Sequence, residues 1–177
     1  RRGTSVYFTD KVVPMLPKSL SNGACSLNAG EDKYAMSAHI TLDSNAKLVG
    51  VKIKKSIINS AVRGVYSEVN DLFLHGESSE FYKKYETVYP TLCSMHSLYK
   101  KREKIAYGRG YVELESAESL ILLDADGQPI DIRRRERGDA ERMIEQFMLL
   151  ANEAVAIYMS SVKIPCVYRI HEAPDEE

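Results

Sequence analysis

Two polar side chains interrupt an otherwise apolar segment near the C-terminal end of the chain. From Ala140 to Met159, strong helix formers continue without Pro or Gly, which predicts a helix. Glu145 and Asn152 lie seven residues apart and are therefore nearly superimposed on that helix. A half-buried carboxylate needs a partner or a polar cleft. Either a neighbouring Arg or backbone group satisfies Glu145 at the edge of the core, or both side chains face a ligand.

The rest of this helix divides into two faces when each residue advances about 100°. The apolar face is expected to contain Ile144, Phe147, Met148, Ala151, Ala154, Val155 and Tyr158, and the narrow, solvent-facing strip to contain Arg142, Gln146, Glu153 and Ser160. Glu145 and Asn152 lie beside this strip, so we expect both to be half buried. Gly138 and Asp139 are suited to cap the helix.

Two tyrosines and one basic run are further candidates for binding. Tyr7, between Val6 and Phe8, could pack in a hairpin or offer a free ring face on which an unpaired base stacks. Tyr66 could pack or donate a hydrogen bond through its hydroxyl. The run "IRRRERGDAER" is either a phosphate-binding strip or the solvated end of a strand. None of these signals is specific alone.

Several common chemistries have no motif in this sequence. It contains no GxGxxG, GxxxxGK[ST], HExxH or GxSxG pattern, which argues against those nucleotide, zinc and serine-hydrolase sites. The three cysteines, Cys25, Cys93 and Cys166, are widely spaced without a CxxC pair, and we expect buried thiols. Asp124 and Asp126 lack the remaining ligands of a calcium loop and predict a plain hairpin turn.

The bulk composition is that of a globular domain. The chain has 177 residues, 44% hydrophobic and 28% charged, which is enough for one domain with a substantial core. Its net charge of −1 gives no global electrostatic case for nucleic-acid binding. No apolar run approaches the roughly 18 residues of a membrane span, so we expect no membrane partner and a cytoplasmic location. The missing initial Met and the charged final segment predict a piece of a longer protein.

The periodic segments predict an α+β fold, with β-hairpins or a mixed sheet packed by helices. The expected elements are a hairpin over 33–65, a helix from Tyr66 to Gly76, a helix from about Pro90 to Tyr107, a second hairpin over 111–137, the helix over 140–159 and a strand in "IPCVYRIHE". Pro14 and Pro17 exclude a helix from residues 6–16, and "LSNGACSLNAGED" is rich in turn formers.

Taken together, four segments resemble a known family over essentially the whole chain. They are "RRGTSVYFTDKVVPMLPKSLSNGACSLNAGEDKYAMS", "SAVRGVYSEVNDLF", "DGQPIDIRRRERGDAERMIEQFMLLANEAVA" and "YRIHEAPDEE". In order and spacing they are similar to the central part of the catalytic (RNB) domain of the ribonuclease II and ribonuclease R family, with the closer likeness to ribonuclease R. The resemblance implies that residues 1–177 are the central part of one such domain.

This family degrades single-stranded RNA processively from its 3′ end to nucleoside monophosphates, and the resemblance implies roles for particular residues. Tyr7 matches an aromatic residue that stacks near the 3′-terminal base and sets the length of the limit product. Tyr66 and Glu145 match residues near the terminal ribose that help to distinguish RNA from DNA. Leu114 stands where some relatives have a phenylalanine that sandwiches the base, which puts a two-sided clamp in doubt. Gln146 replaces an acid often found there, a mild change if it faces solvent.

The resemblance also implies a metal that these residues do not hold. The family's magnesium site is built from an aspartate cluster that lies before the start of this sequence, and an active-site arginine segment lies beyond its end. We therefore expect Mg²⁺ in the complete protein and no catalytic activity in this fragment. The alternative is a non-catalytic RNA-binding or scaffold relic of the same domain. We also expect missing flanking segments of the domain to leave apolar surface open, which favours self-association.

Overall fold

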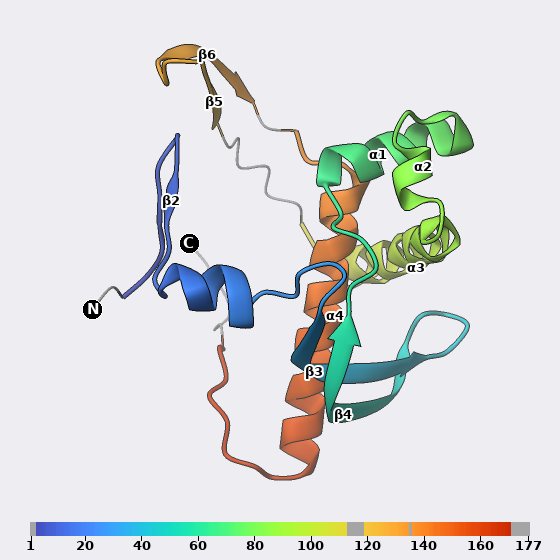
Figure 1. Cartoon of the computed structure of the whole chain (residues 1–177). Helices are drawn as coiled ribbons and strands as arrows, with labels where there is room; N and C mark the ends of the chain where they lie inside the picture. Colours follow the sequence, from blue (N-terminus) through green and yellow to red (C-terminus); the bar gives the residue numbers. More distant parts are fainter. Residues whose placement is uncertain (1–2, 113–118, 135, 171–177) are drawn as a thin grey trace, which may run out of the picture.

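The computed structural model describes residues 3–112, 119–134 and 136–170. Within these ranges, helices and one long hairpin form a packed body, and two smaller hairpins project from it (Figure 1). The described strands form three separate two-stranded antiparallel sheets. The predicted α+β class is therefore confirmed, with the strands arranged as hairpins beside the helices.

The long hairpin joins β3 (Asp32–Leu42) to β4 (Leu48–Asn59). Its turn is closed by the Asp43 carboxylate, which accepts hydrogen bonds from the backbone N–H groups of Asn45 and Lys47, each at 2.9 Å. Ala46 in this turn has a φ of 59° and is only 1% exposed, because the hairpin turn packs against the helices. The buried guanidinium of Arg102 donates to the Ala46 carbonyl at 3.2 Å and so fastens the turn to α3.

Three helices and a 3₁₀ turn follow the hairpin: α1 (Tyr66–His75), η2 (Gly76–Ser78), α2 (Tyr82–Tyr85) and α3 (Tyr89–Gly108). The α1 and α3 bounds agree with the sequence prediction, whereas α2 was not foreseen because one helical turn carries too little periodicity. Gly76 ends α1 with a φ of 58°, a left-handed conformation that favours glycine. Val69, Leu72, Tyr85 and Ala140 form the buried core between these helices and α4.

The last helix, α4 (Asp139–Ser161), runs through the centre of the body and packs against α1, α3 and the β3–β4 hairpin (Figure 1). Its buried stripe consists of Ala140, Met143, Gln146, Leu150 and Ala154. The predicted faces are therefore partly wrong, because the neighbours of α4, and not its most apolar direction, decide which side is inside.

Individual residues of α4 show where those faces differ from the expectation. Gln146 is buried at 6% exposure, although we expected it to face solvent. Met148 and Val155, assigned to the apolar face, are exposed at 60% and 39%. Glu145 is half buried as predicted, whereas Asn152 is exposed. Gln146 therefore lies inside the body and not on its surface.

The smaller hairpins are short and open to solvent (Figure 1). At the N-terminal end, β1 (Val6–Tyr7) pairs with β2 (Val12–Val13). In the turn-rich segment that follows, residues Leu20–Ala24 form a π-helical turn, η1, which turn-forming residue types did not predict. The third hairpin joins β5 (Ser119–Leu123) to β6 (Pro129–Arg134).

The remaining local predictions have mixed outcomes. The Asp124 turn is a plain hairpin turn as predicted, with the Asp124 carboxylate accepting from the N–H groups of Asp126 and Gln128 at 3.0 and 2.8 Å. The strand predicted in "IPCVYRIHE" is wrong for residues 164–170, which have no regular secondary structure; its last two residues lie outside the described ranges. No helix of the described chain is long and apolar enough to cross a membrane.

The cysteine prediction is also wrong. Cys25, Cys93 and Cys166 are free thiols as expected from their spacing, but all are exposed. Cys93 lies on the outer side of α3, Cys25 directly follows η1, and Cys166 follows α4. Residue type alone favoured burial, and the packing of the surrounding elements placed all three at the surface.

Candidate functional site

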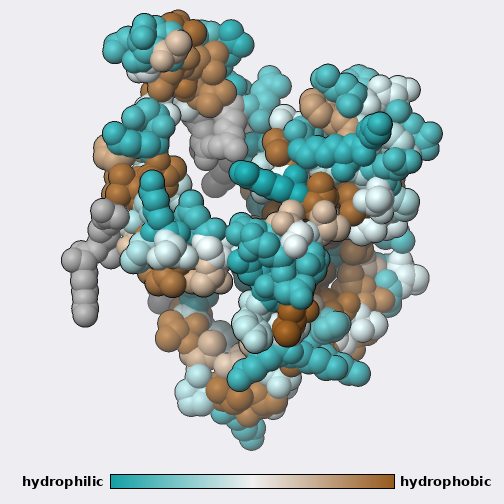
Figure 2. Space-filling model, in the orientation of Figure 1, coloured by the Kyte–Doolittle hydropathy of each residue, from teal (hydrophilic) through white to brown (hydrophobic). Residues whose placement is uncertain are grey.

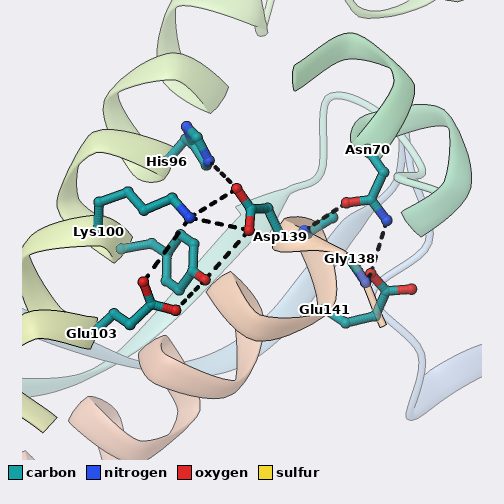
Figure 3. A network of polar contacts seen from close by, with 9 residues as sticks. Asn70, His96, Lys100, Glu103, Gly138, Asp139 and Glu141 are labelled. Atoms are coloured by element: carbon teal, nitrogen blue, oxygen red, sulfur yellow. Dashed lines mark hydrogen bonds and ion pairs between the residues drawn. The ribbon is translucent and has the colours of Figure 1, made fainter. Parts of the chain in front are cut away.

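The N-terminus of α4 is held by an asparagine from another helix (Figure 3). The Asn70 amide of α1 accepts a hydrogen bond from the Ala140 N–H at 2.8 Å and donates to the Glu141 carboxylate at 2.9 Å. Glu141 in turn accepts from the Gly138 N–H at 3.0 Å. First-turn N–H groups of a helix have no partner within the helix, so Asn70 supplies from α1 a cap that α4 lacks.

Gly138 permits this close approach of α1 to α4. A methyl group at Gly138 would lie 2.3 to 2.5 Å from the Asn70 side chain. The backbone of Gly138 is extended, with φ −93° and ψ −174°, so glycine is needed here for space and not for conformation. Gly138 is the N-cap residue, as the sequence allowed, but neither Gly138 nor Asp139 caps the helix with its side chain. The contribution of Asn70 was missed because it lies about seventy residues away.

The next residue, Asp139, ties α4 to α3 (Figure 3). Its carboxylate accepts from His96 Nε2 at 2.8 Å and from Lys100 Nζ at 3.0 Å. Burial alone would raise the pKa of Asp139, but the hydrogen bonds from His96 and Lys100 outweigh it and hold this pKa below its usual value. The buried Tyr99 donates to Glu103 at 2.5 Å, and burial raises the pKa of the Tyr99 hydroxyl.

Glu145 lies less than two turns further along α4 and has its own partners. Its carboxylate accepts from the Arg137 guanidinium and, at 3.4 Å, from the Tyr111 hydroxyl. Arg137 precedes the helix and folds back along it, so no helical spacing rule could have identified the pair. The first interpretation of Glu145, a carboxylate satisfied by a neighbouring Arg, is therefore realised. Its side chain remains 33% exposed and can still accept a further donor.

Tyr66 opens α1 beside an apolar pocket of about 260 Å³. The side chains that line the pocket with it include Val69, Leu92, Met95, Met143 and Ile144. Ile144 directly precedes Glu145, so the pocket reaches the turn of α4 that carries Glu145, although Glu145 itself does not line it. Asn152 is not part of this arrangement. The Tyr66 residue is 42% exposed and is available at the rim of the pocket.

The other two predicted site residues lie elsewhere. Tyr7 is on β1 in the projecting N-terminal hairpin, with 77% of its surface exposed (Figure 1). It therefore has the free ring face that a stacking role requires, but it does not line the pocket at Tyr66. Leu114 lies outside the described residues.

A second, larger cleft adjoins the Tyr66 pocket through Gly64, which lines both. It measures about 800 Å³ and lies between the segment after η1 and the end of β4. Its polar lining consists of Asn22, Ser26, Asn28, Ser60 and Arg63. Sequence reasoning missed this cleft, because its walls come from segments that share no pattern.

Metal binding finds no support among the described side chains. Within residues 3–112, 119–134 and 136–170, no group of three or more His, Cys, Asp or Glu side chains is placed to hold a metal ion. His75 and His96 bind Asp71 and Asp139 at 2.9 and 2.8 Å, as structural histidines do. The magnesium expected from the resemblance was placed in the complete protein, with ligands before residue 1, and stays a prediction.

Comparison with known proteins identifies the family. The RNB domain model matches residues 1–177, the whole chain. The chain belongs to the RNB domain family. Ribonuclease R 2 of Lactococcus lactis is 40% identical over 99% of this chain, and ribonuclease R of Thermotoga maritima is 41% identical over 100%. The chain spans only 27% and 25% of the length of these two relatives.

Solved structures agree with the family assignment. Mycoplasma genitalium RNase R in complex with ribose-methylated single-stranded RNA matches with a TM-score of 0.85 and 33% identity, over 97% of this RNB chain and 26% of that one. The same enzyme in complex with double-stranded RNA matches with a TM-score of 0.81, over 91% of this chain and 28% of the other. The arrangement of helices and hairpins described above is thus that of an RNase R RNB domain.

Proposed function

We propose that this RNB chain is the central part of the catalytic domain of a processive 3′-to-5′ exoribonuclease that hydrolyses single-stranded RNA to nucleoside monophosphates. The observation that carries the proposal is the match of the whole chain, in sequence and in fold, to RNase R, including a structure bound to single-stranded RNA. The contribution of these residues is then to bind and orient RNA along one wall of its channel.

The geometry around Tyr66 and Glu145 supports a ribose-recognition site. A half-exposed carboxylate can accept a hydrogen bond from a 2′-hydroxyl, which DNA lacks. Arg137 and Tyr111 contact Glu145 from the protein side and restrict the orientations of the carboxylate. The Tyr66 hydroxyl, at the rim of an apolar pocket, could donate to the same sugar while the pocket accepts an apolar face.

Tyr7 supports a separate stacking role. Its ring is exposed on a hairpin outside the body, and an aromatic face can hold any unpaired base without reading its identity. In this proposal Tyr7 holds RNA at a distance from Glu145 and so influences where shortening stops. Leu114 remains a proposed contact to the terminal base, by packing and not by stacking.

Magnesium is proposed for the complete protein, where it would polarise the phosphate and the attacking water. The described side chains do not form a site for it, so the metal ligands are proposed to lie in flanking segments of the same domain. The chain by itself is accordingly proposed to be inactive, since losing such electrostatic stabilisation costs orders of magnitude in rate.

The proposal is tested with 5′-end-labelled single-stranded RNA, Mg²⁺ and two proteins: the complete protein and the 177-residue chain. Stepwise shortening from the 3′ end by the complete protein alone is the expected result. Binding without shortening by the complete protein would instead support the non-catalytic relic. Shortening by the 177-residue chain that persists through purification would place the catalytic centre within these residues and overturn the proposed division.

Self-association of the isolated chain is a separate proposal about partners. Apolar side chains gather on the surface of the projecting hairpins (Figure 2). Ile130 and Ile132 on β6 are 65% and 68% exposed, and Leu120 on β5 is 46% exposed. Clustered apolar surface of this kind favours association. Light scattering across a concentration series should show a rising mass, and a constant monomer mass would contradict the proposal.

The cytoplasmic location of the protein also stays a prediction.

A further inference from the structure

The polar cleft beside Tyr66 has walls that are fixed to one another. The Gly30 N–H donates to the Ser60 carbonyl at 2.8 Å, and Ala29 forms a bridge with Ser60. These contacts join the segment after η1 to the end of β4 at the boundary of the cleft. The hydroxyl of Ser26 and the amide of Asn28 are also held, by the carbonyls of Ser21 and Asn22 at 2.6 and 3.2 Å. The cleft is therefore a built feature of the fold.

Arg63 gives the polar cleft its positive charge. Arg63 is the charged side chain in the lining, which contains no Asp or Glu. Within the described part of the chain, no hydrogen bond or ion pair engages the Arg63 guanidinium, which is exposed. Glu31, just beyond the cleft segment, is paired with Lys33 at 2.6 Å and also accepts a hydrogen bond from Asn28 of the lining. Among the described residues, an anion entering the cleft would thus meet the Arg63 guanidinium in the wall, with the Glu31 carboxylate held by Lys33 and Asn28.

The lining also indicates which part of a nucleic acid fits. None of the described residues that line the cleft is aromatic, so they offer no surface for base stacking. Arginine, by contrast, presents paired N–H donors that match the two free oxygens of a phosphodiester. The Asn22 amide and the Ser60 hydroxyl, which also line the cleft, can add neutral hydrogen bonds. These features favour the phosphate backbone over a base.

We propose that Arg63 and the polar groups around it bind one phosphodiester of the RNA. This proposal rests on the proposed function, because it names a contact to the RNA substrate. The cleft shares Gly64 with the pocket at Tyr66, and its other wall follows the hairpin that carries Tyr7. A strand held by both tyrosines would therefore pass its backbone over Arg63. Since the chain as a whole has a net charge of −1, an isolated cationic contact should contribute measurably to binding.

The first test measures binding of single-stranded RNA to the complete protein across a salt series, without divalent metal so that the RNA stays intact. Arg63→Ala should weaken binding about three- to tenfold at low salt and reduce the magnitude of the salt slope by about 0.7, the loss expected for one phosphate contact on a single strand. Arg63→Lys should retain the slope, because it retains the charge. Lys52→Ala, an exposed cation on β4, is the charge-matched control and should leave the slope unchanged.

The second test locates the phosphate. A set of RNAs is made in which one linkage at a time, counted from the 3′ end, is a neutral methylphosphonate. One linkage should weaken binding to the unmutated protein about as much as Arg63→Ala does, and should have no further effect in Arg63→Ala. Equal losses in both proteins at every linkage, or an unchanged salt slope in Arg63→Ala, would overturn the assignment. Failure of the unmutated protein to bind or shorten RNA would overturn the proposed function instead, so the two failures are distinguishable.

Discussion

The helical body and the projecting hairpins of this chain position their proposed binding side chains by different means (Figure 1). In the body, Leu72, Tyr85 and Tyr99 are almost fully buried, and α4 packs against α1, α3 and the β3–β4 hairpin. In β6 every residue is exposed, and antiparallel pairing with β5 holds its hairpin together. Glu145 is therefore positioned by tertiary packing, whereas Tyr7 is positioned by a hairpin of two residue pairs.

The polar contacts follow the same division. Around the N-terminus of α4, Asn70 and Asp139 connect α1 and α3 to one helix end through residues far apart in sequence. In the hairpins, the ion pair of Arg133 with Asp131 at 2.7 Å is local and solvent-exposed. Exposed local pairs contribute about 0 to 1 kcal/mol, so they cannot fix a position as the network at α4 does. This contrast predicts that Glu145 is held rigidly for the proposed ribose contact, whereas Tyr7 can adapt its position for the proposed stacking on a base.

The largest expected effect is a difference in how substitutions in the body and in the β5–β6 hairpin change the free energy of unfolding. Leu72→Ala removes a core side chain that is 1% exposed and should lower the free energy of unfolding by about 2 to 5 kcal/mol. Ile132→Ala, at 68% exposure on β6, should change it by less than about 0.5 kcal/mol. Urea unfolding followed by circular dichroism measures both. Similar losses for the two variants would break the comparison.

A smaller effect is expected at the proposed ribose contact. Glu145→Ala in the complete protein should lower cleavage about 10- to 150-fold, which corresponds to a hydrogen bond to a charged group worth about 1.5 to 3 kcal/mol. It should also reduce the preference for RNA over an RNA that ends in a 2′-deoxynucleotide. Asn152→Ala, exposed on the same helix, is the control and should change neither. An unaltered preference in Glu145→Ala would remove this residue from ribose recognition.

The close contact of α1 with α4 predicts a steric effect that a second substitution relieves. Gly138→Ala should cost about 1 to 3 kcal/mol of stability, because its methyl group would overlap the Asn70 side chain. Asn70→Ala should cost about 1 kcal/mol through the lost cap. The double variant should be more stable than the sum of the two losses predicts, since the overlap is gone. Strict additivity in denaturant unfolding would show that the two residues do not interact.

The Asp139 contacts predict a pH dependence of stability confined to the body. The pKa of Asp139 is lower in the folded state than its ordinary value, so its contribution is complete above about pH 5 and is lost as pH falls through the folded pKa. Asp139→Asn should lose about 1 kcal/mol at pH 7 and show a shallower decline toward pH 3. Hydrogen bonds from Lys84 and Ser79 also lower the pKa values of Glu68 and Asp71, so some decline should remain. A decline unchanged by Asp139→Asn would contradict this assignment.

The smallest effect on turnover is expected at Tyr7. Tyr7→Ala should leave the rate on long RNA near normal but lengthen the limit product, because one stacking contact of about 1 to 3 kcal/mol is lost outside the body. Tyr7→Phe keeps the ring and should behave as the unmutated protein. Product ladders on denaturing gels measure the end point. A ladder identical in Tyr7→Ala would show that the hairpin does not hold the RNA.

Local sequence determined the elements of this protein and the family to which it belongs. The sequence predicted the bounds of α1, α3 and α4 to within about two residues. It did so through helix periodicity and through end signals such as Gly76 and Gly138, because helix propensity and capping depend on neighbouring positions. Alternating residues and turn formers also located the β3–β4 and β5–β6 hairpins, whereas the short β1–β2 hairpin was not predicted. The half-buried state of Glu145 also followed from its place on the helix.

Tertiary packing alone decided which surfaces are inside and which side chains meet. Gln146 is buried and Met148 exposed because α1, α3 and the β3–β4 hairpin lie on one particular side of α4, a choice that periodicity leaves open when apolar residues surround the helix. The Asn70 cap and the cleft at Arg63 join segments distant in sequence, and no spacing rule connects them. Interactions between residues close in sequence specified the helices and hairpins, and packing between residues distant in sequence formed the cap, the pocket and the cleft.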